Sequence, residues 1–504
     1  MSRLQIEDNQ DWKAIKECIR SSQQDFDLET TKLDLKDIAN KKISDKIVDN
    51  PNFLFFPSDL HQRGDKIGES HIISMKDDMI STGNIMGFVG VNDTQLDIKS
   101  RFAQDDEDYF LHYMLQKVFA INLFDIKHTT NKQQIFDFLL YLFPYYLKKA
   151  LAQGFFKKYR RFEHNDANIR GPINISRHIR ENIPFKGTVA YSTREHSYDN
   201  EITQLVRHTI EFIRTKQLGA NILNNDMETK ESVSQIVMAT QTYNARERQK
   251  VINQNLRPIR HPYYSEYTPL QKICLQILRH ESLKYGHEKD KVYGILFDGA
   301  WLWEEYLNTI FVKYQLGITH AKNKTGENGI NLYENGRKCY YPDFYRKPNV
   351  PTKKTITSYT EMDESSRCRN CPTGETGFVL DAKYKRLGKD VIVDEQENSR
   401  NLQNSISICH DDLFQMITYM HVLPAKKCAL VYPLERKEQS KNEIVKAHPR
   451  ILMGYGGEIT GYGIPIPEIL SEQKYSNFCE SMNKVESFLK EEIKTIISNN
   501  NSPN

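Results

Sequence analysis

The residues best suited to chemistry in this sequence are Asp381 and Lys383, which flank Ala382 in the run Gly377-Phe-Val-Leu-Asp-Ala-Lys. Apolar, β-branched and aromatic residues in a short run that begins at a glycine predict a β-strand. Alternate side chains of a strand share one face, so the carboxylate and the ammonium are expected to project together. Such a pair can hold a divalent cation and a water molecule side by side, which is the chemistry of metal-dependent phosphodiester hydrolysis.

A second carboxylate, Asp343, follows Pro342 in the only Pro-Asp pair of the chain. Because proline cannot donate to a sheet ladder, this pair is expected to end or kink a strand and to bring Asp343 to the same sheet edge. Asp343, Asp381 and the carbonyl of Ala382 would then form a set of hard oxygen ligands. Such a set predicts a Mg²⁺ site in which Mn²⁺ substitutes, with Lys383 orienting the attacking water and stabilising charge on phosphorus.

The acid-x-lysine spacing by itself has no diagnostic value, because it recurs in this charged sequence, for example at Asp97-Ile-Lys99. No second carboxylate is placed to join Asp97, so that triplet predicts only the solvent face of a strand. Asp381 differs in its context. The Pro-Asp pair lies upstream, and downstream Gln415 and Tyr419 are four residues apart, on one face of a predicted helix. An equally open interpretation of these two side chains is a helix face packed on the sheet.

Pro342-Asp343, Asp381-Ala-Lys383 and Gln415-x-x-x-Tyr419 together resemble the PD-(D/E)XK nuclease signature in the variant of RecB-type nucleases. From roughly Ile80 to Pro433 the chain resembles the McrC family, the nuclease subunits of McrBC-type restriction systems. Further similar phrases lie at Trp301-Leu-Trp-Glu304-Glu305 and at Cys428-Ala-Leu-Val-Tyr432-Pro433. The resemblance implies a Mg²⁺-dependent endonuclease that cuts double-stranded DNA.

The resemblance also implies roles for residues around the metal. Glu304 would reach the metal shell from a helix predicted over Ile295 to Tyr314. Adjacent glutamates point about 100° apart, so only one of Glu304 and Glu305 can face inward, and an exposed ion pair is the alternative for either. Gln415 would contact DNA or order the site, and Tyr419 would pack behind it or contact phosphate.

A partner is implied as well. McrC-like subunits pair with a hexameric AAA+ GTPase, McrB, that reads modified DNA and translocates, and their N-terminal region docks onto it. The present sequence has no G-x-x-x-x-G-K-[ST] phosphate loop, and Gly454-Tyr-Gly-Gly457 and Gly461-Tyr-Gly463 predict hairpin turns rather than a nucleotide cradle. We therefore expect that this chain binds no nucleotide and that an McrB-like partner supplies the energy.

The elements around these residues predict a multidomain α+β protein. Residues 1–50 predict an accessory helical segment, and residues 51–104 predict a small β-rich, partner-docking domain because their short apolar runs are separated by Gly, Asn and Asp. Residues 105–282 predict a mainly helical middle domain. Residues 283–504 predict an α/β restriction-endonuclease-like domain with a mixed central sheet and a C-terminal helix.

Composition sets broad limits. The 504 residues are too many for one ordinary core. The net charge of +3 is uninformative about nucleic acid, because local patches rather than totals attract phosphate. Eight cysteines without a secretory segment predict free thiols in the cytoplasm. The most apolar run, Phe136 to Leu147, is too short for a membrane span and contains Asp137 and Pro144, so it predicts a core helix.

Two features allow more than one interpretation. Basic and aromatic residues alternate in Phe155 to Phe162 and in Arg177-His-Ile-Arg180, which suits DNA contact but equally suits a solvated face that buries its rings. Cys368-Arg-Asn-Cys371 with Cys339 offers part of a zinc site, whereas a structural zinc needs four ligands. An exposed loop with incidental thiols is the alternative.

Three functions fit these observations. The first is the restriction nuclease subunit. The second is a stand-alone PD-(D/E)XK nuclease of repair or recombination, and the third is a non-catalytic adaptor that stimulates an AAA+ NTPase. Intact Asp343, Asp381 and Lys383 argue against the third.

Overall fold

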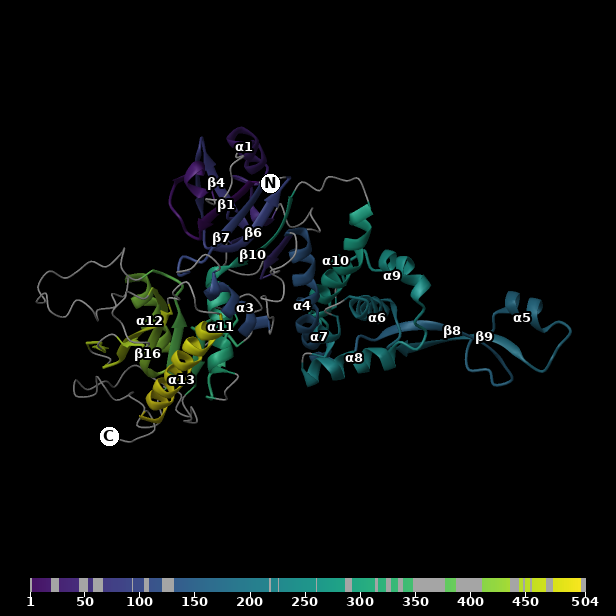
Figure 1. Cartoon of the computed structure of the whole chain (residues 1–504). Helices are drawn as coiled ribbons and strands as arrows, with labels where there is room; N and C mark the ends of the chain where they lie inside the picture. The colour runs from purple at the N-terminus through teal and green to yellow at the C-terminus, as the bar shows by residue number, and fades with distance from the viewer. Residues whose placement is uncertain are drawn as a thin grey trace, which may run out of the picture. The chain divides into compact units, whose positions relative to one another are not determined.

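The computed structural model describes most of the chain and divides it into two compact units, Met1–Ala120 with Asp290–Asn504, and Ile121–Lys289 (Figure 1). The described residues are 2–19, 27–44, 53–57, 67–92, 94–103, 108–119, 131–216, 219–224, 226–259, 261–285, 292–312, 316–322, 328–333, 339–347, 377–386, 410–435, 444–446, 449–453, 456–467 and 475–499.

The first unit contains an N-terminal sheet of five strands in the order β1-β7-β6-β10-β3. β1 runs parallel to β7 and β10 parallel to β3, whereas β6 is antiparallel to both β7 and β10. Leu4, Val89 and Leu96 of this sheet share a buried core with Leu35 of α1 and Ile80 of a smaller sheet, β2-β5-β4. The bounds are β1 (Ser2–Glu7), β2 (Lys13–Ala14), α1 (Leu28–Lys36), β3 (Phe53–Phe56), β4 (Ile73–Lys76), β5 (Met79–Thr82), β6 (Ile85–Val91), β7 (Thr94–Lys99) and β10 (Val292–Asp298).

Two expectations for these segments were wrong. The accessory helical segment over residues 1–50 begins instead with a strand, because Leu4 and Ile6 alternate with polar residues and bury on one face. The helix predicted from Ile295 begins only at Gly299, because Val292–Asp298 pairs with β6 and β3. Residues 292–298, assigned in advance to the C-terminal domain, therefore complete the N-terminal sheet.

A second sheet carries most of the C-terminal segment. Its order is β11-β14-β15-β16-β19-β17, with β18 also paired to β19. β14 is antiparallel to β15, and β15, β16 and β19 are parallel, so the sheet is mixed as predicted. The bounds are β11 (Thr319–His320), β14 (Phe344–Arg346), β15 (Gly377–Ala382), α12 (His410–Val422), β16 (Ala425–Glu435), β17 (Val445–Lys446), β18 (Arg450–Ile451) and β19 (Glu458–Ile466), beside a separate pair of short strands, β12 (Ile330–Asn331) and β13 (Cys339–Tyr340).

Helix α12 covers one face of this sheet, where its Met416 and Met420 share a core with Val379 and Leu430. The predicted turn at Gly461 to Gly463 was wrong, because these residues lie inside β19 and pair with β16. The glycines at 456 and 457 do form a turn, since the N–H of Gly456 donates to Leu452 and that of Leu452 to Gly457.

Three helices complete the first unit: α3 (Tyr109–Phe119), α11 (Gly299–Phe311) and α13 (Tyr475–Asn499), the last being the predicted C-terminal helix. The buried Glu486 of α13 joins them, because it accepts hydrogen bonds from the hydroxyls of Tyr113 at 2.6 Å and Tyr306 at 3.0 Å and pairs with Lys117 at 3.0 Å. Buried carboxylates need such partners to offset the loss of hydration.

The second unit packs α10 against α4 and α6. Leu147, Leu205 and Ile277 are fully buried among these helices, and the apolar run around Pro144 is a core helix, as predicted. Asn200 caps α6 by accepting from the N–H groups of Ile202 and Thr203. The bounds are α4 (Asn131–Ala152), β8 (Lys158–Asp166), α5 (Ile175–Asn182), β9 (Val189–Ser197), α6 (Glu201–Arg214), α7 (Gly219–Leu223), α8 (Met227–Ala239), α9 (Arg248–Gln254) and α10 (Tyr267–Tyr285).

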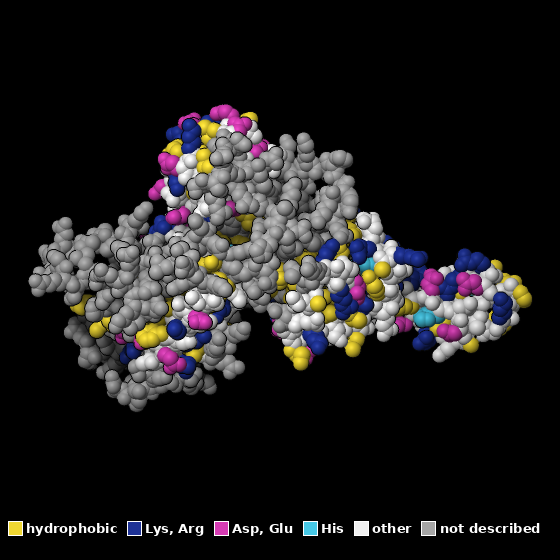
Figure 2. Space-filling view, in the orientation of Figure 1, with side chains coloured by type: hydrophobic (Ala, Val, Ile, Leu, Met, Phe, Trp, Pro, Cys, Tyr) yellow, Lys and Arg dark blue, Asp and Glu magenta, His cyan; other side chains and the backbone are white. Residues whose placement is uncertain are grey.

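Helices make up most of the described part of this unit, and β8 and β9 add an antiparallel pair of strands with nine residue pairs, which the sequence did not predict. Both basic and acidic side chains are exposed on the part of the surface formed by β8, β9 and α5 (Figure 2). Ile169, Ile175 and Phe185 are exposed around α5. None of the helices within the described ranges has the length and apolar character needed to cross a membrane.

Candidate functional site

The antiparallel pairing of β14 with β15 positions the two predicted aspartates. Phe344 pairs with Leu380, so Asp343, which precedes β14, lies beside the end of β15, where Asp381 and Ala382 are. The N–H of Ala382 donates to Asp343 Oδ2 at 2.7 Å. The structure therefore brings both carboxylates to one sheet edge, as the Pro-Asp break predicted.

The two carboxylates interact strongly. Burial raises the pKa of Asp343 well above its ordinary value, and the negative charges of Asp381 and Glu304 raise it further. Burial also raises the pKa of Asp381, although the ammonium of Lys383 opposes this effect. Neighbouring acids in a low dielectric disfavour ionisation of both, and a bound cation would relieve this repulsion.

Lys383 lies within this cluster of charges. Its Nζ is 2.6 Å from Asp381 Oδ2, donates to Gln415 Oε1 at 2.8 Å and is 3.4 Å from Asp412 Oδ1. Burial alone would lower the pKa of Lys383, but the adjacent carboxylates outweigh burial and raise the pKa above its ordinary value. The lysine is therefore a fixed cation with a side chain only 14% exposed.

Helix α12 contributes Gln415 and Tyr419 from one face, as the four-residue spacing predicted. Gln415 Nε2 donates to the Tyr419 hydroxyl at 2.9 Å, and that hydroxyl is 3.5 Å from the carbonyl oxygen of Tyr341, two residues before Asp343. Tyr419 is buried. Gln415 thus orders Lys383 directly, whereas Tyr419 packs behind it.

Of the two adjacent glutamates, Glu304 is the one that faces the aspartates. It raises the pKa of Asp343 and lies 2.7 Å from Nε2 of His320. His320 stacks on Phe344, with ring centroids 4.9 Å apart. Glu305 lies instead 3.5 Å from Lys322.

Sequence reasoning assigned no role to Asp412, Lys385 or His320. Asp412 is buried in the first turn of α12 and accepts from Lys385 Nζ at 3.0 Å while it faces Lys383. Its position three residues before Gln415, on the same helical face, is a signal that could have identified it. Lys385 shares the strand parity of Lys383. Nothing in the sequence points to His320, whose contact with Glu304 depends on β11.

The donor set at this edge suits a hard divalent cation. Within the described parts of the chain, no group of three or more His, Cys, Asp and Glu side chains is arranged to hold a metal. Mg²⁺ often uses only one or two carboxylates and completes its shell with water and substrate phosphate, so Asp343 and Asp381 fit that ion. The N–H of Ala382 donates a hydrogen bond to Asp343. The carbonyl oxygen of Ala382 is the atom expected to serve as a metal ligand.

Other predicted features find local explanations or lie outside the described residues. Arg177 is buried and pairs with Glu163 at 2.5 Å, so it ties α5 to β8. Arg180 lies 3.3 Å from Glu181 on the exposed side. Cys368 and Cys371 are outside the described residues, and the zinc hypothesis stays a prediction; Cys339 is a free thiol.

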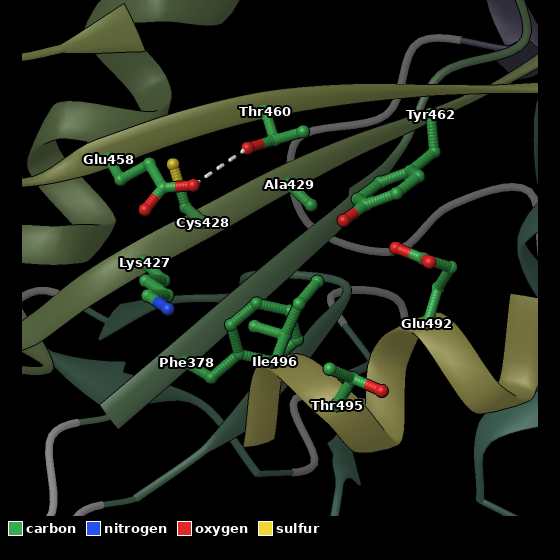
Figure 3. A pocket seen from close by; sticks show the side chains of 10 residues that line it. All are labelled: Phe378, Lys427, Cys428, Ala429, Glu458, Thr460, Tyr462, Glu492, Thr495 and Ile496. Atoms are coloured by element: carbon green, nitrogen blue, oxygen red, sulfur yellow. Dashed lines mark hydrogen bonds between the residues drawn. The ribbon is translucent and has the colours of Figure 1, made fainter. Parts of the chain in front are cut away.

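A small pocket elsewhere in this unit contains none of the predicted site residues. Glu492, Thr495 and Ile496 of α13 point toward β16 and β19 there, and Thr460 donates to Glu458 at 3.4 Å (Figure 3). The carboxylate and lysine cluster therefore remains the candidate site.

Comparison with known proteins gives three findings. The sequence profile of the family described as "McrBC 5-methylcytosine restriction system component" matches residues 80–357 and 369–433. No curated protein matches the chain. Two solved structures from Thermococcus gammatolerans are similar to it. One, a half-complex from a tetradecameric assembly of McrB AAA+ hexamers with bound McrC, is 13% identical, covers 96% of this chain and 100% of that chain, and has a TM-score of 0.38. The other, an McrBC complex, is 14% identical, covers 62% and 87%, and has a TM-score of 0.27.

The fold and site define a mixed α/β protein with a partly buried cluster of acids and lysines at the edge of a mixed sheet. The family match covers more than half of the chain. The chain belongs to the family of McrBC 5-methylcytosine restriction system components, which confirms the resemblance.

Proposed function

We propose that this chain is the McrC-type nuclease subunit of an McrBC restriction system, with a PD-(D/E)XK site that cuts double-stranded DNA in the cytoplasm. The observation that carries the proposal is the convergence of Asp343, Asp381 and Lys383, which come from separate parts of the sequence and meet at one sheet edge. Membership of the restriction family supports it.

Asp343, Asp381 and the carbonyl of Ala382 are the groups that would hold Mg²⁺ or Mn²⁺. When bound, such an ion polarises the phosphodiester and lowers the pKa of a coordinated water. Lys383 orients that water and stabilises negative charge on phosphorus, as a fixed ammonium in a partly buried site can.

The surrounding residues hold this lysine in place. Gln415 and Asp412 approach Lys383 from α12, and Tyr419 fixes the amide of Gln415. Glu304 adds negative potential that favours cation binding. A catalytic group held by several partners loses less freedom when the transition state forms.

The partner and substrate follow from the family. The family description names 5-methylcytosine, so we propose methylated DNA as the substrate. McrC of Thermococcus gammatolerans is bound to McrB AAA+ hexamers in its assembly. We propose that this chain likewise assembles with an McrB-like AAA+ GTPase, which selects the DNA while this chain cuts it.

Lys383→Ala tests the assignment of the catalytic lysine. We expect it to lower Mg²⁺-dependent cleavage of methylated plasmid by at least about 10²-fold, because one electrostatic stabiliser at the reacting centre is lost. Lys99→Ala is the matched control, because Lys99 has the same spacing from an aspartate on β7. Equal cleavage by the Lys383→Ala and Lys99→Ala chains would refute the assignment.

The same assay separates the functions. Cleavage is measured with and without Mg²⁺, GTP and the candidate AAA+ partner, on methylated and unmethylated plasmid. The proposal requires that cleavage depends on Mg²⁺, GTP and the AAA+ partner together, and on methylation of the plasmid. Cutting by the purified chain alone would indicate a stand-alone nuclease, and partner GTPase stimulation without any cutting would indicate an adaptor.

A further inference from the structure

The segment that leaves β15 sends alternate side chains to two different places. Lys383 and Lys385 face the aspartates and Asp412. Tyr384 and Arg386 instead contact the N-terminal sheet, whose strands β1 and β7 end beside them. These four residues follow the end of β15 and are not themselves in a strand, so one short segment contacts both the site and the N-terminal sheet.

Tyr384 is buried, only 3% exposed, at the end of β7. Its hydroxyl is 2.7 Å from the Ser100 Oγ, and Ser100 is fully buried. Its ring lies edge-on to Phe102, with centroids 5.0 Å apart, and the guanidinium of Arg101 lies 4.9 Å from the ring centroid. An aromatic ring with a satisfied hydroxyl is a strong local anchor.

The surface that receives Tyr384 is itself held firmly. Arg101 is buried and pairs with Asp8 through Nη2 at 2.6 Å and Nε at 2.9 Å. Arg386 donates through Nη2 to the carbonyl of Arg101 at 2.6 Å and to Glu7 Oε2 at 3.1 Å. The ends of β1 and β7 therefore hold the segment at two places, on either side of Lys385.

Lys383 has less support from its own sheet. Its N–H donates to the carbonyl of Val431 at 2.9 Å, and β15 ends one residue earlier, at Ala382. The backbone path beyond that bond is set by Tyr384 and Arg386. A displacement of about 1 Å at a reacting group can cost on the order of 10²-fold in rate.

We propose that Tyr384 is a positioning residue for the nuclease site: anchored against Ser100, Arg101 and Phe102, which directly follow β7 of the N-terminal sheet, it holds Lys383 against the aspartates. The N-terminal sheet is then a structural part of the cleavage site. This inference rests on the proposed nuclease function.

The test compares Tyr384→Phe, Ser100→Ala, the double variant and Tyr384→Ala in the full chain with its AAA+ partner, GTP, Mg²⁺ and methylated plasmid. Tyr384→Phe and Ser100→Ala both remove the hydrogen bond between these two side chains. Tyr384→Phe also removes the contact of the Tyr384 hydroxyl with Met86 Sδ at 3.2 Å, and Ser100→Ala removes the bond that Ser100 Oγ accepts from the Phe102 N–H at 3.2 Å. We expect each to lower kcat several-fold with KM unchanged, the double variant to lose less than the product of the two single losses because the variants share one bond, and Tyr384→Ala to lower kcat on the order of 10²-fold.

Tyr113→Phe is the matched control, since it removes another buried tyrosine hydrogen bond in the same unit and should leave kcat unchanged. A second readout needs no metal: mass spectrometry follows acetylation of Lys383 in the free chain. Loss of the anchor should increase the labelling of Lys383 in Tyr384→Ala but not in Tyr113→Phe.

The outcomes are distinguishable. A wild-type chain that does not cut under any condition removes the proposed function and this inference with it. If the wild type cuts, two results would overturn this inference alone. One is that Tyr384→Phe and Ser100→Ala keep the kcat and the Lys383 labelling of the wild type. The other is that they lose no more kcat than Tyr113→Phe does. The two milder variants decide the matter even if Tyr384→Ala does not fold.

Discussion

At the scale of single residues, the site is a balance of like and unlike charges. Burial and the charges of Asp381 and Glu304 raise the pKa of Asp343, burial and Asp412 raise that of Asp381, and Lys383 lowers both. Groups with strongly perturbed pKa values in one cluster are typical of functional sites. Here the repulsion between the carboxylates favours binding of a divalent cation, because such an ion would relieve it.

Asp343→Asn should therefore stabilise the metal-free chain. The folded-state pKa of Asp343 is raised above the ordinary value of 3.8, so the contribution of Asp343 to stability is complete below that pH and is lost as pH rises through the folded pKa. We expect a higher unfolding temperature than wild type in EDTA at neutral pH, with the gain disappearing near pH 3.8. Added Mg²⁺ should stabilise the wild type and not the variant.

The measurement is differential scanning calorimetry across pH, with and without Mg²⁺. Asp11→Asn is the control, because Asp11 is exposed and should show neither effect. A destabilised Asp343→Asn chain at neutral pH in EDTA would contradict the electrostatic account of the cluster.

At the scale of elements, local rules place most of the site. Asp381 of β15 and Lys383, which directly follows the strand, meet on the α12 side. The helical spacing in α12 aligns Asp412, Gln415 and Tyr419 with them. Helix α6 of the second unit carries none of these residues, and its buried His208 gives it a predictable response to acid.

His208 of α6 should make the second unit sensitive to acid. The pKa of His208 is lowered from 6.5 to about 4, mainly by burial and also by the charges of Arg248 and Arg207, while Glu247 and Glu211 oppose the shift. The folded state holds the neutral ring, so this contribution is complete above pH 6.5 and is lost as pH falls toward 4.

Hydrogen exchange of the α6 amides at pH 7 and below pH 5 measures this effect. We expect the loss of protection in acid to be smaller in His208→Leu, whose apolar side chain cannot be protonated. His421→Leu, at an exposed histidine of α12, should behave as wild type. Identical acid responses in all three chains would show that His208 is not the titrating group.

At the scale of the whole molecule, the path of the chain is the main finding. The chain builds β1 to β7, forms the second unit as one continuous segment, and returns as β10 between β6 and β3. The N-terminal sheet is thus closed by residues nearly 200 positions downstream of β7. Contacts of such long sequence range form late and only in the complete chain.

Fragments of the chain test this organisation. A chain that ends at Ala120 lacks β10 and leaves the hydrogen-bonding edges of β6 and β3 unpaired, so we expect it to aggregate or remain unfolded. The continuous segment Ile121–Lys289 should fold by itself, with helical circular dichroism and one cooperative thermal transition. A stable, monomeric 1–120 fragment would contradict the structural role of β10.

The sequence by itself determined the local parts of this protein. It located Asp343, Asp381 and Lys383 and predicted their common edge, because strand parity and a proline break act over a few residues. It also placed Gln415 and Tyr419 on one helical face and predicted the core helix around Pro144 and the C-terminal helix, because periodicity is a local property.

Only the tertiary structure decided which sheet each strand joined and which polar side chains met. Val292–Asp298 is an apolar run that fits either sheet, and its pairing with β6 and β3 depends on distant residues. The choice of Glu304 over Glu305, the roles of Asp412 and His320, and the burial of Tyr384 against Ser100 arise in the same way. All of these features have the same physical reason. Packing and long-range strand pairing set the contacts between elements, and the residue spacing within one element contains no information about them.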